Sequence, residues 1–235
     1  MTKIRHFTLS VIATFILFGF QATPVYAFFG FGCGFEQPTN GNLFLGDDDF
    51  ADVSDLLPAG STFTVFGKPY GPSNPGIFVG SNGYITFGAG DSSPFENFSN
   101  HCDLPRISAL FDDLNPTQGG AVKAEFQPSP ARLIVTWDGV PEFLNNGSNT
   151  FQIILFLYTN KYRIIYDGVA AIDGLVGICE GPTDPDDLSR LRTEASGMQV
   201  IYEDFNGGNN FDLDGDCLKG NANPLFGRPA TIYNN

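Results

Sequence analysis

Aspartates are the residues of this chain whose type and spacing offer the most chemistry. Asp112 and Asp113 stand side by side at the end of an apolar stretch. Paired carboxylates serve as acid and base in a hydrolase, or as ligands of calcium. Because adjacent strand residues point to opposite faces, we do not expect both carboxylates to reach one substrate. Turn structure is the first interpretation of this pair, calcium binding the second and catalysis the third.

A second acidic segment has the spacing of a calcium loop. Asp212, Asp214 and Asp216 occupy alternate positions, and Gly215 is the sixth residue counted from position 210. Calcium loops need alternate oxygen donors and a glycine in sixth place. The twelfth residue is Asn221 instead of the usual glutamate, so we do not expect an EF-hand. Calcium held by the three aspartates and a plain acidic turn are the two interpretations, and calcium is the one cofactor the sequence suggests.

The sequence offers no nucleophile paired with a base. His101 is the one histidine beyond the N-terminal residues, and it adjoins Cys102, a spacing that rarely gives a nucleophile and base pair. Neither Gly-x-Ser-x-Gly nor His-Glu-x-x-His occurs. We therefore expect no enzyme activity. His101 is interpreted as a loop residue beside a disulfide cysteine, and the single tryptophan, Trp137, as a core residue in preference to a sugar-stacking platform.

The N-terminal residues predict export. Lys3 and Arg5 precede an apolar stretch at residues 7–20, which is shorter than the about 20 residues of a membrane span. Small or apolar residues then lead up to Ala27, which is signal-peptide anatomy. We expect residues 1–27 to be a signal peptide cleaved after Ala27 and residues 28–235 to be secreted. No later stretch is apolar over 18 residues, so no transmembrane segment is expected.

The net charge and the cysteines narrow the class of protein further. The chain has 12 basic and 26 acidic residues, a net charge of −14, which repels the phosphates of nucleic acids. Its cysteines are too widely spaced for a zinc knuckle, and an even number in an oxidising compartment favours two disulfides. The three possible pairings stay open. The four cysteines are Cys33, Cys102, Cys179 and Cys217.

The elements that must position these residues are short strands separated by turn residues. About ten strands with turn signals every 8–12 residues predict an all-β fold, an antiparallel β-sandwich with long loops and little helix. We expect one domain over residues 28–235, with residues 182–235 as a C-terminal extension packed on it. The strands are predicted at residues 61–66, 106–111, 121–126, 132–137, 150–157, 162–166, 175–179, 198–202 and 231–233, with a hairpin at 76–88 and two helical turns at 185–192.

Four ordered blocks of sequence resemble the nidogen-like (NIDO) extracellular domain. They are SNGYITFG at residues 81–88, LPRISALFDDLNP at 104–116, RLIVTWDGVP at 132–141 and TFQIIL at 150–155. The resemblance runs over about residues 63–181. It implies an extracellular β-domain associated with matrix or cell-surface adhesion, and it brings no catalytic residues to this chain.

These observations predict a secreted, non-catalytic binding or adhesion protein of the matrix or cell surface. Its ligand would be an extracellular protein or a glycan, bound by loops such as residues 90–100 and 141–149. One alternative is a calcium-dependent secreted hydrolase using Asp112 or Asp113. Another is a structural matrix component that self-assembles through exposed strand edges. Asn97 and Asn146 begin Asn-x-Ser glycosylation motifs.

Overall fold

The structure is a computed structural model that describes residues 33–37, 41–73, 75–144, 146–181, 200–206, 211–223 and 230–233. The predicted signal peptide at residues 1–27 and the predicted helical turns at 185–192 lie outside these residues. In the described part of the chain, no helix has the length and apolar character needed to cross a membrane.

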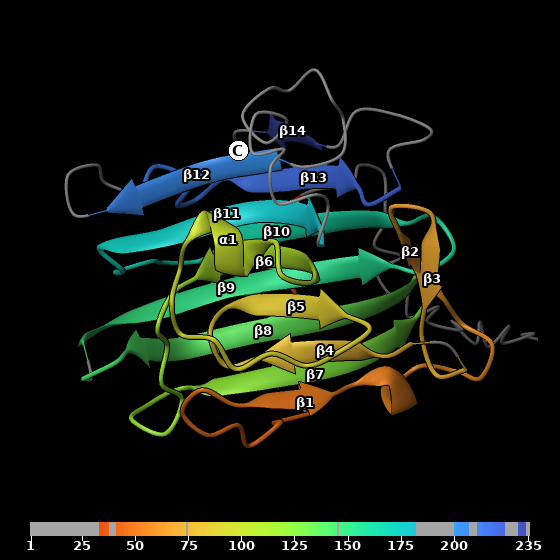
Figure 1. The fold of residues 1–235 in the computed structure, drawn as a ribbon, viewed down its shortest axis with the longest axis horizontal. Coiled ribbons are helices and arrows are strands. Elements are labelled where there is room, and N and C mark those ends of the chain that lie inside the picture. Colours follow the sequence, from red (N-terminus) through yellow and green to blue (C-terminus); the bar gives the residue numbers. More distant parts are fainter. Residues whose placement is uncertain are drawn as a thin grey trace, which may run out of the picture. The chain divides into compact units, whose positions relative to one another are not determined.

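Two six-stranded antiparallel sheets lie face to face, as Figure 1 shows. This arrangement confirms the predicted all-β sandwich. The first sheet has the order β1 (Phe50–Asp52), β4 (Ile77–Gly80), β5 (Tyr84–Phe87), β6 (Pro105–Phe111), β11 (Asp173–Glu180) and β12 (Val200–Asn206). The second has the order β14 (Ala230–Tyr233), β13 (Cys217–Asn221), β10 (Lys161–Tyr166), β9 (Asn146–Phe156), β8 (Ala131–Glu142) and β7 (Ala121–Pro128).

Three small elements complete the described structure. The 3₁₀ turn η1 (Ser54–Leu56) follows β1, and α1 (Phe98–His101) is a single helical turn inside a stretch predicted as a loop. A separate hairpin joins β2 (Phe63–Val65) to β3 (Lys68–Tyr70). The strand predicted at residues 61–66 therefore ends at Val65, and the chain turns back at Phe66 and Gly67 into β3. Pro69 is tolerated in β3 because a two-stranded hairpin has a free edge, where a residue without an N–H leaves no ladder hydrogen bond unmade.

The predicted hairpin at residues 76–88 is confirmed, with β4 and β5 joined by a turn at Ser81–Gly83. Gly83 has a φ of +80°, a conformation that side chains rarely adopt. A Cβ atom at this position would lie 1.7 Å from the carbonyl oxygen of Leu110. The glycine therefore lets the turn lie directly against β6.

The core between the sheets follows the period-two pattern of the strands. In β9, Ile153 and Leu155 join the main core, whereas Ile154 and Phe156 face the other side of the sheet. Trp137 of β8 is fully buried and stacks on Phe151 with ring centroids 5.0 Å apart, which confirms its predicted core position.

Both expected disulfides form, and the pairing is Cys33 with Cys217 and Cys102 with Cys179. The first fixes residues 33–37 on the outer face of the second sheet, where Cys33 packs against buried apolar residues. The second ties the residue after α1 to β11. The strands β12 and β13 extend the two sheets through pairing with β11 and β10 respectively.

His101 differs from its prediction as an ordinary loop residue. It ends α1 and is fully buried, with Nδ1 3.0 Å from the hydroxyl of Ser108. Burial, together with the nearby charge of Arg106, lowers its pKa well below the usual value. The imidazole is therefore neutral and part of the core, not available as an exposed base.

Candidate functional site

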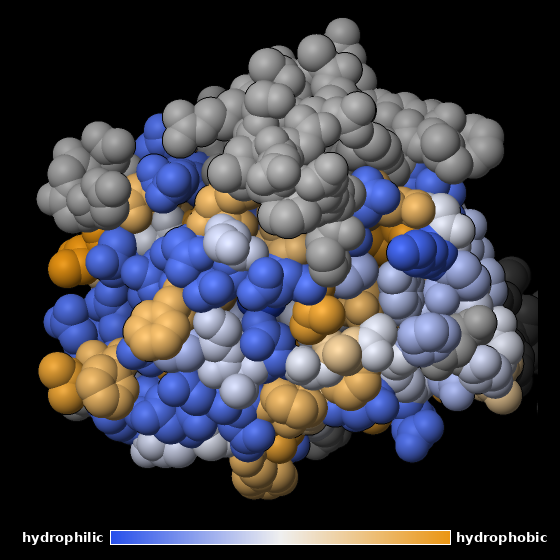
Figure 2. Space-filling view, in the orientation of Figure 1, coloured by the Kyte–Doolittle hydropathy of each residue, from blue (hydrophilic) through white to orange (hydrophobic). Residues whose placement is uncertain are grey.

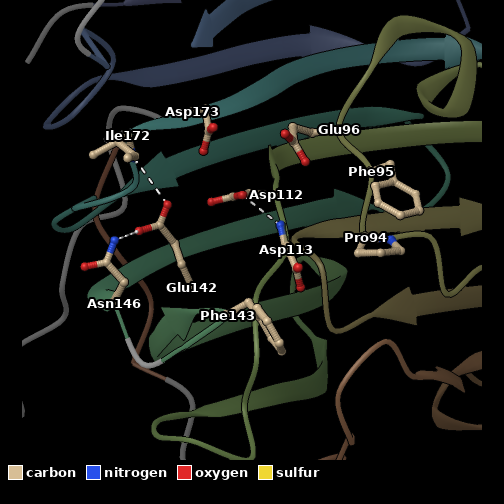
Figure 3. Close-up of a pocket in the computed structure, with 10 residues that line it drawn as sticks. All are labelled: Pro94, Phe95, Glu96, Asp112, Asp113, Glu142, Phe143, Asn146, Ile172 and Asp173. Atoms are coloured by element: carbon tan, nitrogen blue, oxygen red, sulfur yellow. Dashed lines mark hydrogen bonds between the residues drawn. The ribbon is translucent and has the colours of Figure 1, made fainter. Parts of the chain in front are cut away.

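A pocket of about 300 Å³ opens at one end of the sandwich (Figure 3). Its lining combines carboxylates with apolar side chains, and no basic residue is among them. The loop of residues 90–100 and the β8–β9 hairpin, which the sequence suggested as binding segments, both contribute to it. The lining residues are Pro94, Phe95, Glu96, Asp112, Asp113, Glu142, Phe143, Asn146, Ile172 and Asp173.

The pocket forms where the chain passes from one sheet to the other. After β6 ends at Phe111, residues 112–115 run beside the end of β8 in the opposite sheet. The N–H of Phe143 donates to the carbonyl of Asp113 at 2.7 Å, and Leu114 forms a bridge with Glu142. This crossing brings the end of β6, the end of β8 and the start of β11 to one place.

Three carboxylates meet on the floor of the pocket. Asp112 follows β6, Glu142 ends β8 and Asp173 begins β11. Their carboxylate oxygens lie within 4.8 Å of one another, and Figure 3 shows the three side chains directed toward a common point. We call these three residues the acidic floor. Asp112 and Glu142 are only 4% and 7% exposed, so the floor is largely withdrawn from solvent.

The hydrogen bonds of the floor are incomplete. Asp112 Oδ1 accepts from the backbone N–H of Asp113 at 2.7 Å, whereas its buried Oδ2 has no partner. Glu142 accepts from the amide of Asn146 at 2.9 Å and from the N–H of Ile172 at 3.3 Å. A buried carboxylate oxygen without a donor is costly when it is ionised, so this arrangement favours either a proton or a cation at Asp112.

Burial and mutual repulsion shift the acids of the pocket toward the protonated form. Burial, followed by the charge of Glu142, raises the pKa of Asp112, and burial also raises the pKa of Glu142. Burial and the nearby Asp48 raise the pKa of Asp113 to about 6. Glu96 follows the same direction because it is partly buried. No basic side chain is among the described residues that line the pocket, so none of them neutralises these acids.

Apolar side chains form the rim of the pocket. Phe95 is 69% exposed and Ile172 is 60% exposed, and Phe143 beside them is also exposed. We call these three residues the apolar rim. Figure 2 shows hydrophobic residues standing among hydrophilic ones on this face, several of them at the end where the β8–β9 hairpin lies in Figure 1. Large exposed aromatic side chains beside a pocket are typical of a binding surface.

The loop that carries Phe95 is anchored to the first sheet by buried groups. Asp91 forms an ion pair with Arg106, whose guanidinium lies 4.2 Å from the ring centre of Tyr84 and 4.8 Å from that of Phe111. The hydroxyl of Tyr84 donates to the carbonyl of Ser93 at 3.2 Å. These contacts tie the loop that carries Phe95 to the first sheet.

The predicted pair Asp112 and Asp113 divides between two acidic groups. Asp112 belongs to the floor, while Asp113 has its carboxylate near Asp47 and Asp48, a mostly exposed group. The two side chains point in different directions in Figure 3, although both residues follow β6 and lie outside the strand from which the sequence argument started. Both nevertheless line one pocket, which the sequence did not indicate.

Sequence reasoning missed the carboxylates that accompany Asp112. Glu142 lies within the segment 141–149 that was singled out as a binding loop, and this was the one available signal. Asp173 precedes a predicted strand and Glu96 lies in the other predicted loop. Neither has a spacing that connects it with Asp112.

The structure describes residues 211–221 of the predicted calcium loop, and the three aspartates do not converge on one point. Within the described residues, Asp212, Asp214 and Asp216 form no group with carboxylate oxygens close enough for one ion. Asp214 accepts from the N–H of Gly168 at 3.0 Å, and the N–H of Asp212 donates to Glu203 at 3.0 Å. Calcium binding at this loop stays a prediction.

A protein-family model matches most of the chain. No curated protein and no solved structure matches the chain significantly. A family model described as NIDO related matches residues 27–206, which is more than half of the chain and includes every residue that lines the pocket. The segment with Asp212, Asp214 and Asp216 lies beyond this match. The chain therefore belongs to the NIDO-related family.

Proposed function

We propose that this protein is secreted and binds an extracellular protein or glycan of the matrix or cell surface at the pocket, without catalysing a reaction. The observation that carries this proposal is the combination of a buried acidic floor with an exposed apolar rim. Membership of a nidogen-related family and two disulfides both suit an extracellular location.

The composition of the pocket sets the chemistry of the ligand. A ligand would place an apolar portion, such as an aromatic side chain or the apolar face of a sugar, against Phe95 and Phe143. A polar portion would then reach the floor at Asp112. Rigid presentation of the rim lowers the entropy lost on binding, because the anchored loop has little freedom left to lose.

A paired set of variants tests this proposal. The double variant Phe95→Ser/Phe143→Ser removes both aromatic side chains of the rim. Phe44→Ser is a matched control because Phe44 is 84% exposed and outside the pocket. The probes are a glycan array and a library of displayed peptides, both in millimolar calcium. We expect wild-type and control protein to select the same ligands, and the double variant to bind them at least about tenfold more weakly. Equal binding by all three proteins, or no ligand for wild type, would contradict the proposal.

One observation favours a hydrolase as the second candidate function. Asp112 and Glu142 are close, buried carboxyls with raised pKa values, the arrangement by which some enzymes keep one acid protonated beside one base. Hydrolysis in peptide and glycan panels that disappears in both Asp112→Asn and Glu142→Gln would support this function. Inactivity of the wild-type protein across the panels would leave binding as the function.

A further inference from the structure

We infer that the acidic floor binds a divalent cation, Ca²⁺, through the carboxylates of Asp112, Glu142 and Asp173. Only the role of the cation in ligand binding rests on the proposed function, because the cation would form part of the surface that the ligand contacts. It assigns calcium to a different place from the sequence-predicted loop at Asp212 and Asp214.

The first support is geometric. Calcium binds oxygen ligands at 2.3–2.6 Å, so two ligands of one ion are at most about 5 Å apart. One carboxylate oxygen from each residue of the floor lies within 4.8 Å of the other two. Glu142 and Asp173 are end residues of β8 and β11, and Asp112 directly follows β6, so three strand ends of the sandwich hold the ligands in place before the ion arrives.

The second support is the orphaned oxygen of Asp112. This side chain is 96% buried, its Oδ2 has no hydrogen-bond partner, and Figure 3 shows the carboxylate directed toward Glu142 and Asp173. A protein that buries such an oxygen normally supplies a donor or an ion for it. A cation bonded to Oδ2 would satisfy the oxygen and offset the repulsion among the three acids at the same time.

The donor set selects the kind of cation. The floor offers carboxylate oxygens and neither thiolate nor imidazole, which suits calcium or magnesium and not zinc. Calcium accepts irregular geometry and takes six to eight ligands, whereas magnesium requires a nearly ideal octahedron. Three carboxylates leave several positions of a calcium ion for water. Those facing the pocket could be taken by hydroxyl or carboxylate oxygens of a ligand.

The experiment measures calcium binding by thermal unfolding and by calorimetric titration of purified protein first stripped with EDTA. Wild type should show saturable heat and an upward shift of several degrees in Tm, because an ion that binds only the folded state stabilises it. Magnesium should give a smaller shift. Asp112→Asn and Asp173→Asn should each abolish the calcium-induced shift in Tm. Because Asp173 is only partly buried, Asp173→Asn should fold even if the substitution at the buried Asp112 causes a folding defect.

Matched controls locate the ion. Asp47→Asn removes a carboxylate of the exposed acidic group, and Asp214→Asn removes one of the predicted loop. Both variants should keep the wild-type shift in Tm. No saturable binding by wild type would overturn the inference, because Asp112 would then be satisfied by a proton. A shift retained in Asp112→Asn and Asp173→Asn, or lost in Asp214→Asn, would also overturn it.

The ligand assay separates this inference from the proposed function. The variant Phe95→Ser/Phe143→Ser should retain the calcium shift while losing the ligand. Ligand binding by wild type that is unchanged in EDTA would exclude a cation in recognition and leave the binding function intact. A calcium shift in a protein that selects no ligand would leave the cation site intact and contradict the binding function.

Discussion

The side chain of Asn82 accepts a hydrogen bond at 3.1 Å from the backbone N–H of Leu114, which lies 32 residues further along the chain. Its amide group donates to Asp48 at 2.8 Å and to the carbonyl of Ser93 at 3.1 Å. Asn82 is fully buried in the turn between β4 and β5. One side chain therefore holds both the segment that carries Asp112 and the loop that carries Phe95.

Replacing Asn82 should weaken both the fold and the pocket. The variant Asn82→Ala removes the side-chain acceptor of the Leu114 N–H and the donor to Asp48 and Ser93, although the Leu114 N–H keeps its bond to the carbonyl of Asp112. The loss of these buried hydrogen bonds should lower the free energy of unfolding by about 1–3 kcal/mol. The calcium-induced shift in Tm should also decrease, because the segment around Asp112 loses its support. Urea unfolding checks the first effect. Asn42→Ala, at an exposed position, should stay within about 0.5 kcal/mol of wild type, and an equal loss in both variants would contradict this role.

Substitutions of Arg106 and Asp91, which form an ion pair, should have strongly non-additive effects on the free energy of unfolding. Asp91→Ala leaves the fully buried guanidinium without its charged partner, a change that costs about 3–5 kcal/mol in buried pairs. In Arg106→Met/Asp91→Ala no charge is left unpaired, and a similar volume still packs between the rings of Tyr84 and Phe111. The double variant should therefore be more stable than the sum of the single losses predicts. Additive losses, measured by urea unfolding, would argue against the pair as an anchor for the loop.

Stability should depend on pH through His101. Burial lowers the pKa of this imidazole well below its unfolded value of about 6.5, so the unfolded chain takes up a proton that the folded protein excludes. The contribution of His101 is complete above pH 6.5 and is lost as the pH falls below it. The stability of wild type relative to His101→Gln should decrease by about 1.4 kcal/mol per pH unit below pH 6. The contributions of acids that titrate in both proteins cancel in this difference. A stability difference that stays constant from pH 7 to pH 5 would contradict a neutral, buried His101.

The disulfide between Cys102 and Cys179 should contribute substantially to stability. It links residues 77 positions apart and joins the end of α1 to β11. Its removal raises the conformational entropy of the unfolded chain and so favours unfolding. Cys102→Ala/Cys179→Ala should lose about 2–5 kcal/mol in urea unfolding. Because α1 follows directly on the rim loop, ligand binding should weaken as well. Unchanged stability of this double variant, relative to wild type with both disulfides intact, would show that the bond does not constrain the unfolded chain.

The sequence predicted the sandwich because its signals are local. The hairpin at residues 76–88 depends on near neighbours and appears in the structure as β4 and β5. The alternation at residues 61–66 also forms a strand, although β2 pairs with β3 outside the two large sheets. The short elements β1, β3 and α1 were not predicted, because a few residues carry too little periodicity to distinguish a strand or a helical turn from a loop. The disulfide pairing was open for a related reason, since spacing along the chain does not fix which cysteines approach.

The site could be predicted only in part. Asp112 was identified from its neighbour Asp113, but the partners of Asp112 are set by contacts between distant segments. Glu142 reaches the floor because β8 is paired with residues 113–115, and Asp173 because β11 lies beside β6. No spacing in the sequence encodes either pairing. The predicted loops at residues 90–100 and 141–149 were informative because turns at one end of a sandwich are presented together.

Anomalous diffraction from crystals grown in calcium would locate the ion itself. We expect a calcium peak in the pocket, bonded to Asp112, Glu142 and Asp173 at about 2.4 Å. A floor without a peak, in which Asp112 Oδ2 shares a proton with Glu142, or a peak only among Asp212, Asp214 and Asp216, would contradict this expectation.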